Sequence, residues 1–231
     1  MIQCEGLVYA YPDGTRALDG LDLTIERGER VAIVGRNGSG KSTLIRHWNG
    51  LLRPSAGQVL LDGVPTANRR VAELARVVAL TFQDPDRQLF AGTCRREVSF
   101  GARNVGLRGA ELASAVDEAL DSVGLADRAE ANPFDLGGSK RRLLALATVL
   151  AMRTAVVVLD EPTMGLDAIE IARVAAVVAT LATEGRTVVA ISHDARFVAG
   201  SFERVIRLDA GRVAADDRTA IRRTIPQVNY T

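Results

Sequence analysis

Hydrophobic and polar positions along the chain follow two kinds of pattern. Short runs rich in Val, Ile and Leu, bounded by Gly, Pro or charged residues, predict strands at residues 31–34, 59–61, 77–82, 156–159, 187–191 and 205–208. Longer runs with apolar residues every three or four positions predict helices at residues 41–49, 111–123, 140–152 and 168–183. This alternation of strands and helices is typical of a parallel sheet that is covered by helices.

Two segments depart from that alternation. The stretches LDLTIERGER (21–30) and GQVLLDGV (57–64) alternate and turn like an antiparallel β lobe, whereas residues 84–151 contain helical patterns and no convincing strand. The run VVVL at residues 156–159 is apolar throughout, which is typical of a parallel strand buried on both faces. The sequence therefore predicts an α/β fold with a parallel sheet, an N-terminal antiparallel β lobe and an inserted helical subdomain. We expect a single domain over residues 1–231, with the helical subdomain at about residues 84–152.

Composition narrows the functional classes. Hydrophobic residues make up 47% of the 231 residues, which is enough for a core, and 29 basic residues balance 28 acidic ones. A net charge of +1 gives no sign of a general nucleic-acid binder, so no nucleic-acid partner is expected. The apolar runs are shorter than the ~20 residues that cross a bilayer, and the first residues do not form a secretory signal. Cys4 and Cys94 match no metal-ligand spacing, and we expect both to be reduced thiols.

A glycine-rich motif follows the first parallel strand. The strand VAIV is succeeded by GRNGSGKST at residues 35–43 and then by a helix, which is the spacing and setting of a phosphate-binding loop. Backbone N–H groups of such a loop attract phosphate oxygens, Lys41 reaches the β and γ phosphates, and the Ser42 hydroxyl can ligate Mg²⁺. The alternative is a glycine turn without a ligand. The predicted nucleotide-binding residues here are Gly35, Asn37, Gly38, Ser39, Gly40, Lys41, Ser42 and Thr43.

Two carboxylates stand at the end of the apolar strand in VVVLDEPT. Asp160 and Glu161 are costly at the edge of a core unless a cation or a reaction needs them. Asp160 is predicted to hold Mg²⁺, and Glu161 to polarise the water that attacks the γ-phosphate. An ordinary pair of carboxylates at a strand end is the alternative. Together with the loop, these residues predict a hydrolase of ATP or GTP.

The order of the remaining motifs resembles that of the ATP-binding-cassette (ABC) ATPases, the motor subunits of ABC transporters, over essentially the whole chain. The resemblance implies that Tyr11 in YAYPDGTRAL stacks on adenine, and that Gln83 in TFQDP links the metal site to a membrane partner. It also implies that His193 in ISHD touches the γ-phosphate and that residues 165–167 form the D-loop. The implied cofactors are ATP and Mg²⁺. The implied catalytic residues are Glu161, His193 and Gln83, and the implied metal ligands are Ser42, Gln83 and Asp160.

Simpler alternatives exist for several of these residues. Tyr11 could be a packing residue of the core, Gln83 a turn residue and His193 a helix cap. On the helix after the phosphate-binding loop, we expect Trp48 in the core and His47 at the surface.

The run FQDPDRQLFAGTCRREVSFGARNVGL at residues 82–107 resembles the ATPases of energy-coupling-factor transporters, which import vitamins and transition-metal ions. The resemblance implies that a transmembrane coupling subunit docks near Gln83–Phe100, and it places the chain at the cytoplasmic face of the membrane as a peripheral subunit. Related importers share part of the run, so the ATPase of another importer, for amino acids, metals or lipids, is the alternative. The residues expected to line the docking groove are Arg87, Gln88, Phe90, Glu97 and Phe100.

The family's signature segment L-S-G-G-Q acts in trans, on ATP held by a second ABC ATPase subunit. Aligned without gaps from Asp160, its equivalent here is LGGSK at residues 136–140, so Gly137, Gly138 and Ser139 are expected to contact a partner's nucleotide. Gly137 replaces the serine hydroxyl, Ser139 the second glycine and Lys140 the glutamine. A gapped alignment that keeps GGSK in place of GGQK needs one more residue in the following helix. We expect a slowed composite site, in either a homodimer or an asymmetric pair.

These observations predict the ATP-hydrolysing subunit of an ABC importer. A slow-turnover subunit that closes on ATP is the second possibility, because the signature segment is altered. A soluble ABC protein acting on DNA or ribosomes is disfavoured by the balanced charge and by the lack of a long coiled coil.

Overall fold

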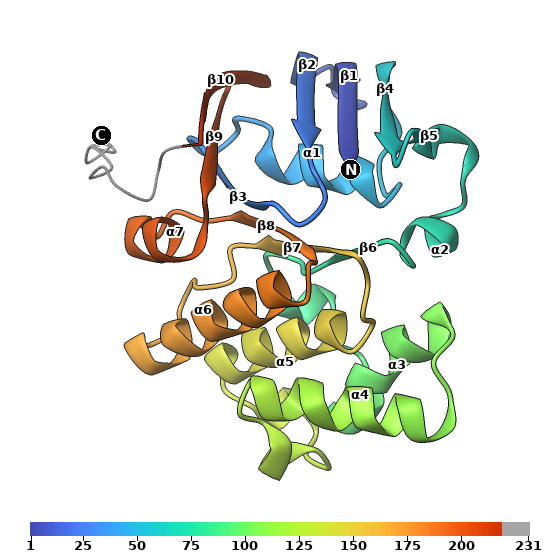
Figure 1. Cartoon of the computed structure of the whole chain (residues 1–231), viewed down its shortest axis with the longest axis vertical. Helices are drawn as coiled ribbons and strands as arrows, with labels where there is room; N and C mark the ends of the chain where they lie inside the picture. The colour runs from blue at the N-terminus through green and yellow to red at the C-terminus, as the bar shows by residue number, and fades with distance from the viewer. Residues whose placement is uncertain (219–231) are drawn as a thin grey trace.

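The computed structural model describes residues 1–218, and Figure 1 shows two sheets with helices below and beside them. Of the polar stretch at residues 216–231, positions 219–231 lie outside the described residues. The strands are β1 (Ile2–Ala10), β2 (Arg16–Ile25), β3 (Arg30–Val34), β4 (Ala56–Leu61), β5 (Val64–Pro65), β6 (Val78–Leu80), β7 (Val156–Asp160), β8 (Thr187–Ile191), β9 (Arg204–Asp209) and β10 (Arg212–Asp217). The helices are α1 (Lys41–Trp48), α2 (Val71–Leu74), α3 (Cys94–Val105), α4 (Gly109–Ser122), α5 (Gly138–Leu150), α6 (Ala168–Thr183) and α7 (Ala195–Ser201).

The central sheet has the order β10-β9-β3-β8-β7-β6, and all its strand pairs are parallel except β9 with β10. Every residue of β7 and β8 is buried, as expected for strands covered on both faces. The predicted parallel α/β core is therefore confirmed. The strand expected at residues 77–82 is shorter, because the N–H of Phe82 bonds to the side chain of Gln88 instead of a neighbouring strand.

The antiparallel sheet has the order β2-β1-β4-β5 and confirms the predicted β lobe. Strand β1 was not predicted as a separate element. It pairs with β2 and β4 through several register shifts, so its buried residues do not alternate strictly with exposed ones. Such irregularities remove the period-two signal on which strand prediction relies.

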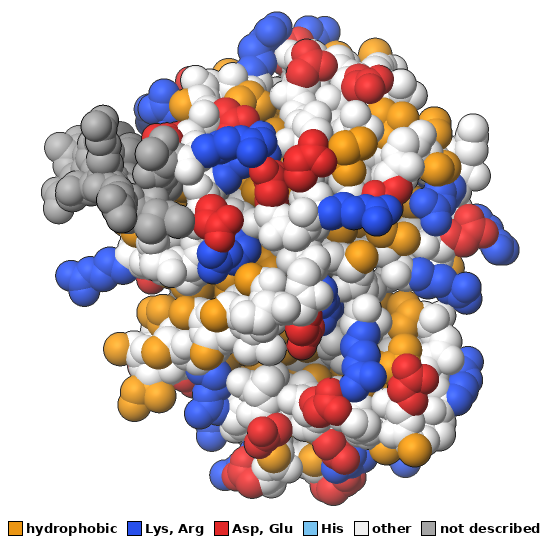
Figure 2. Space-filling view, in the orientation of Figure 1, with side chains coloured by type: hydrophobic (Ala, Val, Ile, Leu, Met, Phe, Trp, Pro, Cys, Tyr) orange, Lys and Arg blue, Asp and Glu red, His pale blue; other side chains and the backbone are white. Residues whose placement is uncertain are grey.

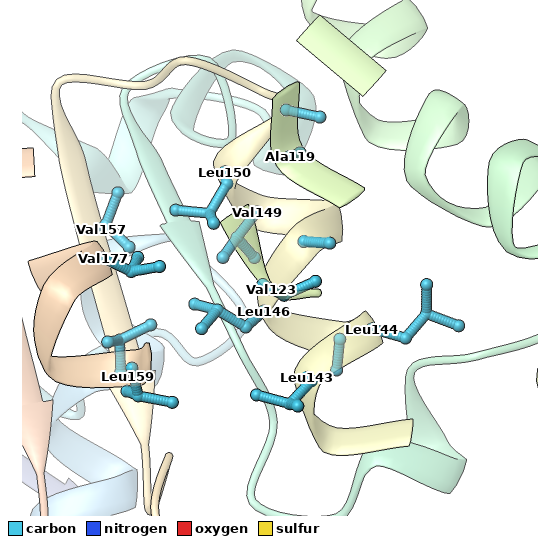
Figure 3. Packing of buried hydrophobic residues seen from close by; sticks show 14 of the residues in the cluster. Ala119, Val123, Leu143, Leu144, Leu146, Val149, Leu150, Val157, Leu159 and Val177 are labelled. Atoms are coloured by element: carbon cyan, nitrogen blue, oxygen red, sulfur yellow. The ribbon is translucent and has the colours of Figure 1, made fainter. Parts of the chain in front are cut away.

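Helices α3, α4 and α5 pack together below the central sheet, and α5 lies between the outer helices and the sheet (Figure 1). In Figure 3, Leu143, Leu146 and Leu150 of α5 point toward β7 and α6, while Leu144 points the opposite way. Every residue of α5 from Leu143 to Leu150 is buried. The bounds of α3 were not predicted, since its buried apolar stripe consists of only Cys94, Val98 and Ala102 on an otherwise polar helix. Within residues 1–218, no helix combines the length and the apolar character needed to cross a bilayer.

The packing around α5 makes a direct prediction for stability. Leu144 is 0% exposed, so Leu144→Ala should lower the free energy of unfolding by about 2–5 kcal/mol. Leu51 is 44% exposed, and Leu51→Ala should change it by no more than about 0.5 kcal/mol. Urea unfolding followed by circular dichroism measures both values. Equal losses for the two variants would show that α5 is not packed as described.

Candidate functional site

The predicted site residues gather at one edge of the central sheet. Because β3, β6, β7 and β8 are parallel, their carboxyl ends point the same way, which is where ligands bind in such sheets. The phosphate-binding loop follows β3, and the segment with Gln83 follows β6. Asp160 and Glu161 lie at the end of β7, and His193 follows β8. The topology thus brings together residues that are far apart in the sequence.

Two glycines of the phosphate-binding loop are required by close packing of the backbone. Gly35 has φ 150°, and a Cβ built there would lie 2.3 Å from the carbonyl oxygen of Leu208 in β9. Gly40 has φ 98°, and its Cβ would lie 2.5 Å from the carbonyl oxygen of Ala17 in β2. The loop is therefore pressed between both sheets. At Gly38, with φ 78°, a Cβ would meet nothing within 4 Å.

The loop presents backbone N–H groups without acceptors. Helix α1 has Gly40 at its N-cap and no side chain caps it. In residues 1–218, no backbone or side-chain acceptor bonds the N–H groups of Gly38, Gly40, Lys41 and Ser42. The Nζ atom of Lys41 donates to the carbonyl oxygens of Gly35 and Arg36, at 2.8 and 3.0 Å. Free amides, a helix N-terminus and a lysine at one point are what a phosphate chain needs.

Asp160 and Ser42 offer oxygen atoms suited to Mg²⁺. Asp160 is 3% exposed, and its Oδ1 atom is buried without a hydrogen-bond partner among the described residues. Burial raises the pKa of Asp160, while the neighbouring Ser42 hydroxyl and the charge of Arg46 lower it. In residues 1–218, no group of three or more His, Cys, Asp or Glu side chains is placed to hold a metal. This pattern fits Mg²⁺, which takes one or two protein oxygens and completes its shell with phosphates and water.

Glu161 is held in an uncommon backbone conformation. Its φ of 52° is in the left-handed region that non-glycine residues rarely adopt. The N–H of Glu161 donates to the carbonyl of Ile191 at 2.9 Å, and its own carbonyl accepts from Arg142 and from the N–H of Met164. Conformations of this kind persist where the surroundings enforce them, and they are common at functional sites.

The side chain of Glu161 is directed at His193. Its Oε1 atom lies 3.2 Å from Nε2 of His193, and its Oε2 atom accepts the backbone N–H of His193 at 3.3 Å. Burial raises the pKa of Glu161 to about 6, and the charge of Asp160 acts in the same direction. Burial, and then the charge of Lys41, lower the pKa of His193, which favours the neutral imidazole. A carboxylate with a pKa near neutrality suits a general base.

His193 is not a helix cap. The cap of α7 is Asp194, whose side chain accepts the N–H groups of Arg196 and Phe197. The imidazole is thereby left to contact Glu161, and the simple alternative for His193 is wrong.

Tyr11 lies beside the end of the phosphate-binding loop. Its hydroxyl and that of Thr43 are 2.9 Å apart, and its ring packs edge-on against Tyr9 with centroids 5.0 Å apart. Tyr11 is half-buried. His47 was expected at the surface, and this is wrong: it is 0% exposed, its Nδ1 atom lies 2.8 Å from the carbonyl oxygen of Thr43, and it packs against Tyr9. Trp48 is in the core as predicted.

Gln83 is exposed, and its carbonyl oxygen accepts a hydrogen bond from Arg142 at 2.9 Å. The same Nη1 atom of Arg142 donates to the carbonyl of Glu161 at 3.1 Å. Sequence reasoning did not single out Arg142. It stands in a run of basic residues at the start of α5, and nothing local distinguishes it from its neighbours.

The altered signature segment lies at the start of α5. Gly137 is the N-cap of the helix, has an extended conformation and makes no capping bond through a side chain. In the ungapped alignment, which stays a prediction, this is the position of the family's serine. Gly137, Gly138 and Lys140 are exposed, and a Cβ at either glycine would meet nothing within 4 Å. No hydrogen bond or ion pair among residues 1–218 joins the segment to the chain's own phosphate-binding loop.

Two of the five predicted groove residues point inward. Gln88 accepts from the N–H of Phe82 and donates to the carbonyl of Ala145 and the hydroxyl of Thr148. Glu97 is 2% exposed and accepts the N–H groups that precede α3, including that of Phe90 at 2.7 Å. The expectation for Glu97 is wrong, because its side chain is buried, whereas Gln88 is half-buried and its place in the groove stays a prediction. The exposed members are Arg87, Phe90 and Phe100.

Comparisons with known proteins agree with this geometry. Residues 18–164 match the family model described as ABC transporter. A putative ABC transporter ATP-binding protein of Streptomyces avermitilis is 45% identical over 94% of this chain and 82% of its own length. The energy-coupling factor transporter ATP-binding protein EcfA of Methanothermobacter thermautotrophicus is 42% identical over 94% and 70%, respectively. The cobalt import ATP-binding protein CbiO of Rhodobacter capsulatus is 41% identical over 95% and 79%.

Solved structures give the same result. The structure of cbiO1 from Clostridium perfringens, part of the cbiONQ complex, has a TM-score of 0.82 and 37% identity, covering 94% of this chain and 88% of that one. An ATP-binding cassette solved as a dimer in a post-hydrolysis state, with ADP and Pi, has a TM-score of 0.87 and 26% identity, covering 97% and 100%. The chain belongs to the ABC transporter family, as a nucleotide-binding ATPase subunit.

Alanine substitutions at Gly38 and Gly40 of the phosphate-binding loop should lower the free energy of unfolding by different amounts. Gly38→Ala should cost only the left-handed strain, about 1–2 kcal/mol. Gly40→Ala adds the clash with Ala17 and should cost about 1–3 kcal/mol more. Chemical denaturation of the nucleotide-free chain measures the difference. Equal losses would contradict the packing of the loop against β2.

Proposed function

We propose that this chain binds ATP with Mg²⁺ and hydrolyses it to power an ABC importer of the energy-coupling-factor type. One observation carries the proposal. Backbone amides without acceptors and Lys41 lie at the same edge of the central sheet as the Glu161–His193 pair. The relatives named EcfA and CbiO support the type of importer.

Nucleotide binding follows from the site residues. Tyr11 would stack on adenine, with its hydroxyl tied to Thr43. The amides of residues 35–43 and the N-terminus of α1 would surround the phosphates, and Lys41 would donate to them in place of the carbonyls of Gly35 and Arg36. The binding residues are those predicted from the motif.

Hydrolysis would use Glu161 as the general base. Its carboxylate would polarise the attacking water and take its proton, and the raised pKa favours that exchange near neutral pH. Before ATP binds, the Nε2–H group of His193 would donate to Glu161 and fix the orientation of the carboxylate, and with ATP bound we assign this donor the contact to the γ-phosphate. Ser42 and Asp160 would hold Mg²⁺, with Gln83 as a further ligand. When bound, this ion neutralises charge on the phosphate oxygens.

The partners are a second ABC ATPase subunit and a transmembrane subunit. The second subunit would enclose ATP against residues 136–140, with Gly137, Gly138 and Ser139 in contact. One related cassette was solved as a dimer in two separate structures, which supports this arrangement. The transmembrane subunit would dock near Gln83–Phe100, where Arg87, Phe90 and Phe100 are exposed and the two phenylalanine rings pack edge-on at 4.8 Å. We place the chain at the cytoplasmic face of the membrane as a peripheral subunit.

We further propose that residues 1–231 are one nucleotide-binding domain, in which residues 84–152 form the helical subdomain.

The cargo would be a vitamin or a transition-metal ion, and an importer for amino acids, metals or lipids is the alternative. A subunit with slow turnover is the second candidate function, favoured by the missing hydroxyl at Gly137.

Two variants test ATP binding and hydrolysis separately. Lys41→Ala should weaken ATP binding about ten- to a hundredfold, because it removes a charged donor to the phosphates. Glu161→Gln should keep ATP binding and lower kcat at least about a hundredfold, because it removes the base. Isothermal titration with Mg²⁺-ATP and steady-state phosphate release measure the two effects.

Arg76→Ala is the control, because Arg76 is an exposed basic residue outside the site and should change neither quantity. The proposed nucleotide site is refuted if Lys41→Ala binds ATP as tightly as the unmodified chain. Undiminished turnover in Glu161→Gln would refute the assignment of the base alone.

The altered signature makes a prediction for the homodimer. Combining Gly137→Ser, Ser139→Gly and Lys140→Gln restores the family's segment at positions that are sterically open. If this chain pairs with itself, the phosphate release rate should rise up to about ten- to a hundredfold, since a hydrogen bond to a charged group returns at each site. Adding Lys41→Ala should abolish the gain. An unchanged rate in a dimer confirmed by light scattering would mean that the segment is not defective.

A further inference from the structure

Arg142 connects two loops that carry different parts of the proposed site. It lies near the start of α5, and its Nη1 atom donates to the carbonyl of Gln83 at 2.9 Å and to the carbonyl of Glu161 at 3.1 Å. Gln83 follows β6 and Glu161 directly follows β7, so one guanidinium holds the backbone just beyond two neighbouring strand ends. A charged donor shared by two carbonyls is a strong constraint on both.

The carbonyl of Glu161 is a sensitive point for such a constraint. Glu161 has a left-handed backbone, which persists only while its surroundings over-determine it. Besides Arg142, the N–H of Met164 donates to that carbonyl at 3.3 Å, and the N–H of Glu161 is bonded to Ile191. Arg142 is the one charged group in this set. Loss of its bond would free the peptide plane that directs the Glu161 carboxylate toward His193.

Arg142 lies in a confined and largely apolar setting. It lines a small cavity of about 10 Å³, in which Thr81 and Asp160 are the other polar residues, and this volume is at the lower limit for one water molecule. The guanidinium is half-buried, so it is screened less than a surface arginine. The side chain next to it, Arg141, has other partners: the carbonyl of Leu136 at 3.0 Å and the carboxylate of Asp86 at 2.9 Å. Only Arg142 joins α5 to the carbonyl of Glu161 among residues 1–218.

The helix that carries Arg142 begins with the signature segment. Gly138, the first residue of α5, is one helical turn before Arg142, so the two move as parts of one rigid element. In a pair of cassettes, Glu161 serves the nucleotide held by this chain, while residues 136–140 face the nucleotide held by the partner. We propose that Arg142 is a positioning residue that couples this chain's catalytic loop to its own signature helix, and thereby links the two composite sites. The inference rests on the proposed function.

Kinetics of Arg142 variants test the positioning role. Arg142→Met should lower kcat about ten- to a hundredfold with little change in the KM for ATP, because the base is misplaced while the phosphate-binding loop is intact. Arg142→Lys should recover part of kcat, since an ammonium can reach one carbonyl. In the Glu161→Gln background, Arg142→Met should add no further loss, because the residue acts through Glu161.

Arg173→Lys is the matched control. Arg173 is a half-buried arginine of α6 that packs across Gly124, outside the site, and its substitution should leave kcat unchanged. The inference is overturned if Arg142→Met keeps full kcat, or if it lowers the residual rate of Glu161→Gln as much as it lowers that of the unmodified chain.

Hydrogen exchange provides a readout that does not depend on turnover. In Arg142→Met, the amides of residues 161–166 should exchange about tenfold faster or more, whereas those of β3 should not change. Unchanged exchange at residues 161–166 would overturn the inference even where hydrolysis is observed. Conversely, if the unmodified chain does not hydrolyse ATP while the exchange result holds, the proposed function fails and the coupling of the loop to α5 stands.

Discussion

A set of backbone N–H groups at the start of α1 finds no acceptor within residues 1–218. Gly35 is pressed against β9 and Gly40 against β2, which fixes the loop between the two sheets. Helix α1 lacks a side-chain cap, and among residues 1–218 the Nζ atom of Lys41 donates only to carbonyls of the loop itself. Buried or constrained amides without partners are costly unless a ligand supplies acceptors. The antiparallel lobe therefore contributes to the site by confining the loop.

The parallel sheet supplies the remaining chemistry by bringing several strand ends together. The carboxylates at the end of β7 lie beside the loop after β3, and each perturbs the pKa of Lys41, which burial lowers and their charges raise. Burial raises the pKa of both Asp160 and Glu161. A site that keeps carboxylates in such surroundings gains from a cation or a reacting phosphate that uses them. The unpartnered Oδ1 atom of Asp160 is consistent with that requirement.

The surface has no dominant charge on the face in view. Figure 2 shows basic and acidic side chains intermixed over the face in view, as the net charge of +1 suggests. Specific contacts must therefore arise from local features, such as the paired rings of Phe90 and Phe100 beside the segment of Gln83. In the same run, Gln88 bonds the segment before α3 to α5, and Glu97 bonds that segment to α3. The altered signature at Gly137 is likewise a local feature, and its effect depends on which subunit completes the site.

Local spacing in the sequence was enough to predict the phosphate-binding loop, the strand-end carboxylates and the alternating core, because each depends on residues that are neighbours along the chain. It could not show that Arg142 bonds to the carbonyl of Glu161, that Glu161 has a left-handed backbone, or that His47 is buried. Nor could it distinguish Gln88 and Glu97 from the exposed residues around them. These properties depend on which elements pack together, since packing decides whether a polar side chain faces water or a buried hydrogen-bond partner.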